Sequence, residues 1–204
     1  MSEYDASNPD PSDPGGIDPD DVELGAELDD TDPALAHAVL EIEEHVAGDG
    51  WDRPARLYAL VDTAALVAQE PALAKLMGLD ASSAEGSLTP VEQDQLAPGV
   101  RLEDVLPTIV WPENVAGCAA VVERLVLPPD ADAAIPDDPD AAAAYAASHP
   151  DRQEVRIIAG VTRAGATYTA LRLRAHDDPA SVVGGADLVP QLTQLLVATL
   201  ESDT

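Results

Sequence analysis

The first pattern along the chain is an apolar stripe at helical spacing that begins directly after Asp32-Pro33. Asp is a favoured helix N-cap and Pro suits the first helical position, so we predict a helix from Pro33 to about Ala47. Glu43 and its acidic neighbours fall outside the stripe and are expected to face solvent. The stripe itself consists of Leu35, Val39, Ile42 and Val46.

Alternating and continuous apolar runs predict the first strands. In residues 56–62, Leu57, Ala59 and Val61 alternate with Tyr58 and Leu60, which predicts a strand. A second strand is predicted at residues 88–96, and Pro90 indicates that it lies at a sheet edge. Residues 118–127 are rich in Val and Leu, which is typical of a buried strand.

The clearest motif in the chain is a β-hairpin. Two alternating segments, 154–162 and 167–174, flank a short turn at residues 163–166 that contains a glycine. Arg172 and Arg174 are expected to project from one face of the second strand, because side chains alternate between the two faces.

Helical patterns fill the remaining segments. The element order places helices between the early strands and a hairpin late in the chain, which indicates an α+β fold. We therefore expect a single α+β domain over residues 32–204, with a mixed, largely antiparallel sheet and helices packed on it. The further helices are predicted at residues 63–69, 71–77, 102–110, 140–148 and 187–201, with loops at 81–86 and 131–139. The apolar side of the last helix is predicted to be Leu188, Leu192, Leu195, Leu196 and Leu200.

Residues 1–31 differ from the rest in composition, because Asp, Pro, Ser and Gly predominate. Such a segment cannot bury enough apolar surface to offset its ordering entropy, so we predict a disordered acidic tail. Its scattered apolar residues are either incidental to a linker, which we favour, or a docking motif that folds on a partner. They are Ile17, Val22, Leu24 and Leu28.

The chain is strongly acidic, with 39 acidic and 10 basic residues and a formal net charge of −29. Residues 1–32 hold 12 of the acids and no base, which leaves −17 on the remainder. A body this negative repels phosphate backbones and anionic lipids, so nucleic-acid binding is disfavoured, whereas basic protein partners are permitted.

The sequence also lacks the patterns of secreted and membrane-inserted proteins. Its start has neither the basic region nor the apolar stretch of a signal peptide. Its longest uncharged C-terminal run, residues 188–200, is shorter than the roughly 20 residues that a membrane span needs. We expect a cytoplasmic protein without direct membrane insertion.

The core must be mainly aliphatic, because the chain has no Phe and only two Trp. Cys118 is the single cysteine, so no intrachain disulfide can form, and its apolar setting predicts a small buried side chain. Trp51 and Trp111 are expected to pack at the ends of the core; an exposed Trp would instead mark a partner surface.

The candidate binding residues are three arginines and an adjoining His-Asp pair. If the hairpin register brings Arg156, Arg172 and Arg174 together, they form a small basic patch suited to a carboxylate or phosphate. The alternative is ion pairing with the abundant acids. His176 and Asp177 follow a strand and can act as a general base or ligand, although the same segment also suits an ordinary turn.

No established catalytic or cofactor motif accompanies these residues. A Gly-rich phosphate loop and a nucleophile elbow are both lacking, and Ser181 has no oxyanion signature, so no catalytic residue and no cofactor is predicted. His37, Glu41 and His45 share a helical face at a spacing that can present metal ligands. We favour solvated side chains there and predict no metal site.

Several runs resemble an uncharacterised actinobacterial protein family over about residues 33–200. The resemblance implies no assigned activity and carries over no catalytic residue. It also implies that the gene neighbours encode a large multi-pass membrane protein and a PDZ-containing membrane-anchored protease. The runs that carry it are residues 35–45, 51–62, 122–127, 149–156 and 171–178.

These observations favour a non-enzymatic accessory or adaptor protein that acts through protein–protein contacts, with a basic or membrane-associated partner. The alternative is a small-anion-binding protein or an enzyme that uses His176, Asp177 and the strand arginines. A homo-oligomer formed through the edge strand near Val91 or through the last helix is a third hypothesis.

Overall fold

The computed structural model describes residues 31–79, 85–96, 100–186 and 188–201. The predicted disordered tail lies outside the described residues except for Thr31, and so does most of the predicted 81–86 loop.

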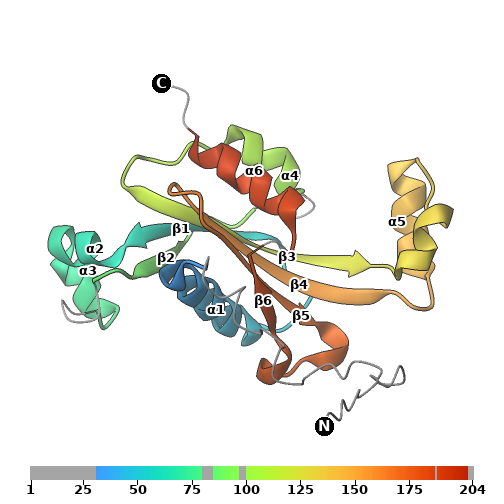
Figure 1. Cartoon of the computed structure of the whole chain (residues 1–204), viewed down its shortest axis with the longest axis horizontal. Coiled ribbons are helices and arrows are strands. Elements are labelled where there is room, and N and C mark those ends of the chain that lie inside the picture. Colours follow the sequence, from blue (N-terminus) through green and yellow to red (C-terminus); the bar gives the residue numbers. More distant parts are fainter. Residues whose placement is uncertain (1–30, 80–84, 97–99, 187, 202–204) are drawn as a thin grey trace, which may run out of the picture. The chain divides into compact units, whose positions relative to one another are not determined.

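Within the described residues, six strands form one antiparallel sheet in the order β2-β1-β3-β4-β5-β6 (Figure 1). The α+β prediction is confirmed, and the sheet is antiparallel throughout. The predicted hairpin joins β4 to β5, and Gly165 adopts a φ of 90° in its turn, a conformation that favours glycine. The strands are β1 (Arg56–Asp62), β2 (Leu88–Glu92), β3 (Val115–Val126), β4 (Gln153–Thr162), β5 (Thr167–Leu173) and β6 (Val183–Gly185).

Helix α1 (Pro33–Ala47) covers one face of the sheet (Figure 1). The Asp32 carboxylate accepts hydrogen bonds from the backbone N–H groups of Ala34 and Leu35, at 2.9 and 3.2 Å, which confirms the predicted N-cap. The predicted stripe is buried against side chains of the four central strands, namely Tyr58, Leu60, Ala119, Val121, Ile158 and Ala170.

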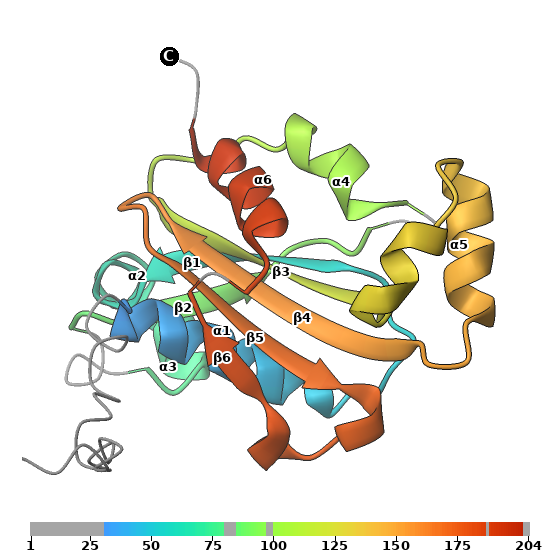
Figure 2. The ribbon, with the colours of Figure 1, turned by 45° about the vertical axis from the view of Figure 1, so that its right-hand side comes forward.

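Helices α4 (Leu102–Val105) and α6 (Pro190–Leu200) cover the opposite face, so the sheet lies between two helical layers (Figure 2). From α6, Leu192, Leu196 and Leu200 enter the core, and each fully buried leucine contributes roughly 1.5–3 kcal/mol. Trp111 is also buried there, as predicted, and its indole N–H donates to the Thr199 hydroxyl at 2.9 Å.

Three further helices extend from the sheet. Helices α2 (Thr63–Gln69) and α3 (Pro71–Leu76) follow β1, and α5 (Pro139–Ser148) lies between β3 and β4 near the far end of those strands (Figure 1). None of the helices in the described ranges is both long and apolar enough to cross a membrane.

Two predicted strands have different bounds in the structure. Strand β2 ends at Glu92 rather than at residue 96, and one further backbone hydrogen bond joins the Gln93 N–H to the carbonyl of Leu57 at 2.9 Å. Strand β3 starts at Val115, earlier than predicted. Its outer residues Leu125 and Val126 are exposed rather than buried, because that end extends past β1 and pairs only with β4.

Strand β6 was not predicted, because Val-Gly-Gly is too short to show a pattern. It forms because β5 offers a free edge and because Tyr168 packs over Gly184, where a Cβ atom would lie 2.2 Å from the phenol oxygen.

The helical predictions also need corrections. The predicted 102–110 helix is only α4 followed by a 3-10 turn, η1 (Leu106–Thr108), since Pro107 lacks the N–H that would continue it. The first part of the predicted 131–139 loop belongs to a second 3-10 turn, η2 (Pro129–Ala134). Helix α6 begins at Pro190, so Leu188 precedes it and is exposed, as is Leu195.

Cys118 is fully buried, as predicted, and burial raises the pKa of its thiol to about 11. We expect the native protein to resist a thiol-specific disulfide reagent at neutral pH, whereas the urea-unfolded chain reacts at once. The folded pKa exceeds the ordinary value of 9.0, so the unfolded chain loses this proton first. The free energy of unfolding should therefore fall as pH rises from 9.0 toward about 11.

The variant Cys118→Ala should lose this part of the alkaline slope, measured by urea unfolding at several pH values. Rapid labelling of the native wild-type protein would contradict the expected burial.

Candidate functional site

Four of the five candidate residues meet around Trp51. The guanidinium carbons of Arg156 and Arg174 lie 4.3 and 5.7 Å from the centroid of the Trp51 ring, within reach of cation–π attraction. The Trp51 indole N–H donates to the Asp177 carboxylate at 2.9 Å, and Arg172 donates to the same carboxylate at 3.3 Å. We call these five residues the Trp51 cluster.

His176, the fifth candidate, lies in the 3-10 turn η3 (Arg174–His176) and is exposed. The Ser181 hydroxyl donates to the backbone carbonyls of His176 and Asp178, at 2.6 and 2.7 Å. These contacts close the turn after β5, and they occupy the Ser181 hydroxyl proton.

The most buried contact of the cluster is the ion pair between Arg172 of β5 and Glu43 of α1. Two guanidinium nitrogens each donate to one carboxylate oxygen at 2.6 Å, and both side chains are at most 5% exposed. Glu43 raises the pKa of Arg172, mainly through these hydrogen bonds. The prediction that Glu43 faces solvent is therefore wrong, because its partner lies 129 residues away in the sequence.

Arg156 is bound between β3 and the loop that follows α1. It donates to the Glu123 carboxylate at 3.0 and 3.3 Å and to the carbonyl of Gly50. The second Glu123 oxygen accepts from the backbone N–H of Asp52 at 2.7 Å. Asp52 has a φ of 65°, which is uncommon for a residue other than glycine, and this hydrogen bond helps to hold it there.

Arg174 is the exposed arginine of the cluster. It donates two hydrogen bonds of 2.9 Å to the Asp52 carboxylate and one of 2.5 Å to Glu154. Hydrogen bonding from Arg174 lowers the pKa of Asp52, and the Trp51 N–H lowers the pKa of Asp177, with Arg172 adding to that effect.

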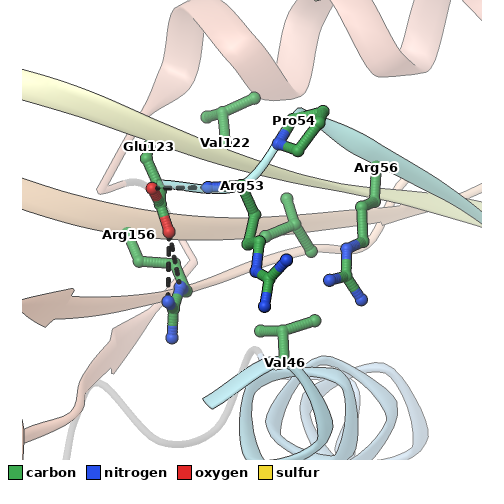
Figure 3. A pocket seen from close by; sticks show the side chains of 8 residues that line it. Val46, Arg53, Pro54, Arg56, Val122, Glu123 and Arg156 are labelled. Atoms are coloured by element: carbon green, nitrogen blue, oxygen red, sulfur yellow. Dashed lines mark hydrogen bonds and ion pairs between the residues drawn. The ribbon is translucent and has the colours of Figure 1, made fainter. Parts of the chain in front are cut away.

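The three arginines therefore form ion pairs with carboxylates. The sequence had left two alternatives, an open basic patch and such ion pairs. Of the buried side-chain polar atoms in the cluster, one guanidinium nitrogen of Arg156, Nη1, has no hydrogen-bond partner. The cavity beside Arg156 measures about 10 Å³, which is room for about one water molecule. Figure 3 shows this cavity with Arg53 and Arg56 beside Arg156 and Glu123. The geometry of the Trp51 cluster suits an internal clamp that holds the 48–53 loop to the sheet.

The remaining sequence candidates lie elsewhere. His37, Glu41 and His45 are all exposed on α1. Across the part of the chain that the structure describes, no group of three His, Cys, Asp or Glu side chains is placed to hold a metal ion.

Several surface grooves are larger than the cavity at Arg156, and sequence patterns did not single them out. One of about 280 Å³ lies between Thr167 and α6. Two smaller grooves lie against the two faces of the sheet. The first, which we call the α6 groove, lies between α4, α6 and the sheet and has a volume of about 180 Å³. Glu103 and Arg124 form an ion pair of 2.6 Å in its wall. Its apolar lining consists of Val122, Ile157, Val189, Leu192 and Leu195.

The second groove, which we call the α1–β2 groove, also measures about 180 Å³. It lies where α1 passes the edge strand β2, with Tyr58 of β1 in its wall. Its other lining residues are Glu41, Ile42, His45, Pro90 and Glu92. Glu41 and His45 could have been paired from their helical spacing, but their proximity to Glu92 depends on how α1 packs on the sheet.

The segment that forms the fold is also the segment that matches a known protein family. Residues 35–201 match the PPA1309-like protein family. The chain belongs to this family. No curated protein and no solved structure matches the chain. For this PPA1309-like protein, the matched range contains the whole Trp51 cluster and every lining residue of both grooves.

Proposed function

We propose that this PPA1309-like protein is a non-enzymatic accessory protein that binds a basic protein partner through the α6 groove. The observation that supports the proposal is that the candidate residues bind other side chains of this protein. The guanidinium and carboxylate groups that suggested chemistry are engaged with one another in the Trp51 cluster, whereas the α6 groove is open and mainly apolar.

The α6 groove has the anatomy of a protein-docking site. Ile157 and Leu192 form an apolar floor that is almost buried, and Leu195 stands at its rim with 37% of its surface exposed. The Glu103–Arg124 pair supplies a polar rim. An apolar centre with a polar rim is typical of protein interfaces, in which a few central side chains carry most of the binding energy.

The negative charge of the chain favours a basic partner. Residues 33–204 carry a net charge of −17, which repels an acidic partner and attracts a basic one. The range of this attraction decreases as the salt concentration rises. We therefore propose a partner that places an aliphatic side chain in the α6 groove and basic residues around it. A cytoplasmic location and a membrane-associated partner belong to the same proposal, the latter because of the gene neighbourhood that the family resemblance implies.

The test is affinity capture with the full-length chain, followed by reconstitution with the purified partner. The variant Leu195→Glu places a charge at the groove, and Leu40→Glu places the same charge at an exposed leucine of α1 outside it. We expect Leu195→Glu to weaken binding about tenfold or more and Leu40→Glu to leave it unchanged. Affinity should also fall as salt rises.

Two outcomes would refute the proposal. One is capture of no specific protein at low ionic strength. The other is a partner that the wild type and Leu195→Glu bind equally well.

A further inference from the structure

We infer that the α1–β2 groove is a second contact site, which takes the cationic side chain of a lysine or arginine of the partner. The inference relies on the proposed function only for the partner being a basic protein. It concerns the face of the sheet that α1 covers, opposite the α6 groove.

The first observation is an unpartnered hydroxyl. Tyr58 is 3% exposed and lines the groove, and its phenol oxygen is one of the buried side-chain atoms of the described chain that have no hydrogen-bond partner. Burial raises the pKa of Tyr58, so the hydroxyl is neutral and its lone pairs can accept a hydrogen bond. A buried polar group without a partner is uncommon in a native protein and indicates a ligand or water at that position.

The second observation is a pair of carboxylates beside this hydroxyl. Glu92 of β2 lies directly opposite Tyr58 in the antiparallel register, and residues so paired share one face of the sheet. Glu41 of α1 lines the groove from the helical side and is exposed. Both carboxylates accept hydrogen bonds, which is the chemistry that recognises an ammonium or guanidinium group.

The neighbouring arginine, Arg56, lies near Tyr58 and Glu92 but makes its short contact with Asp49. Arg56 donates to Asp49 at 2.6 Å, and it lines the cavity beside Arg156 rather than the α1–β2 groove. Its contact with Glu92 is 3.8 Å, longer than a hydrogen bond, so Glu92 keeps free acceptor positions. Asp49 balances Arg56, and His45 is the remaining basic residue of the lining. With a neutral His45, Glu41 and Glu92 give the groove a net negative charge.

The size of the groove fits a side-chain tip rather than a larger ligand. About 180 Å³ exceeds the roughly 10–15 Å³ that one water requires, so a guanidinium or ammonium group can enter with some of its water. Ile42 and Pro90 line the groove as well and offer apolar contact to the methylene stem of a lysine or arginine.

The test is an NMR titration of the full-length protein with N-acetyl-arginine amide and N-acetyl-lysine amide, with N-acetyl-glutamine amide as the neutral probe. We expect the cationic probes to shift the resonances of Glu41, Tyr58 and Glu92, and the neutral probe to leave them unchanged. Glu92→Gln and Tyr58→Phe should each weaken the binding about tenfold, because each removes an acceptor for a charge-assisted hydrogen bond.

Glu44→Gln is the matched control, because Glu44 is an exposed glutamate of α1 that does not line the groove. Tyr58→Phe separates binding from folding. Since the hydroxyl has no partner within the protein, this variant should keep or raise the thermal midpoint while it weakens binding.

Equal shifts with the neutral probe, or equal weakening by Glu44→Gln, would overturn the inference. The two proposals fail separately. If Leu195→Glu abolishes partner binding while Glu92→Gln and Tyr58→Phe leave it intact, the α6 groove stands and the cation site does not.

Discussion

Replacement of Arg172 by methionine is expected to lower the free energy of unfolding by about 3–5 kcal/mol. The reason is that Glu43 would remain as a buried carboxylate without its partner. Both side chains are at most 5% exposed, so water cannot replace the two hydrogen bonds of 2.6 Å. Urea unfolding followed by circular dichroism measures the change.

A double variant distinguishes the cost of an unpaired charge from the net contribution of the pair. Glu43→Leu combined with Arg172→Met removes both charges and keeps apolar volume. We expect this double variant to recover most of the lost stability, because replacing a whole buried pair by apolar residues is often neutral or stabilising. A double variant that is less stable than Arg172→Met alone would contradict this expectation.

Arg174→Met is the control within the same cluster. Arg174 also contacts two carboxylates, but its side chain is 40% exposed. Water can solvate the carboxylates of an exposed ion pair after the arginine is removed. This variant should therefore unfold at nearly the same urea concentration as the wild type. An effect as large as that of Arg172→Met would show that burial is not what distinguishes the two arginines.

The second large effect is expected at Gly160 of β4, where α1 packs directly on the strand backbone. A Cβ atom at this position would lie 2.5 Å from Val39 Cγ2 and 3.0 Å from Leu35 Cδ1. Gly160→Ala should therefore displace α1 and lower the free energy of unfolding by about 1–3 kcal/mol, the range for overpacked cores. Urea unfolding again provides the measurement.

Val39→Ala should partly relieve this clash. In a double-mutant cycle, Gly160→Ala with Val39→Ala is expected to cost less than the sum of the two single variants, with a coupling of about 0.5–3 kcal/mol. Gly48→Ala is the control, since a Cβ atom there meets only ordinary contact at 3.5 Å. Strict additivity of the two single changes would refute the close packing of α1 on β4.

Both predictions concern the placement of α1, and this placement also forms the α1–β2 groove. Glu43 attaches α1 to β5, whereas Gly160 lets it approach β4. Glu41 and His45 of the same helix then reach the edge strand β2. A shift of α1 should therefore change the groove as well as the stability.

Local sequence determined the elements that depend only on near neighbours. Helix α1 has the predicted bounds because its N-cap, its proline and its stripe all act within a few residues. The β4–β5 hairpin is predictable for the same reason, since a short turn with Gly165 sets its register. The aliphatic core and the burial of Cys118 follow from composition and pattern.

Features that depend on distant partners could not be predicted. Strand β6 exists only because β5 offers it an edge. Sequence analysis identified the arginines of the Trp51 cluster as candidates, but it did not decide whether they form a basic patch or ion pairs. That choice depends on Glu43, Glu123 and Asp52.

The sequence by itself determined the α+β fold, the bounds of α1 and the hairpin, and the acidic character of the chain. Only the tertiary structure decided that Glu43 is buried, that Arg156 and Arg174 lie over Trp51 and that the α6 and α1–β2 grooves remain open. The physical reason is that capping, periodicity and turn geometry act over a few residues. An ion pair that spans 129 residues, by contrast, depends on how the helices pack on the sheet.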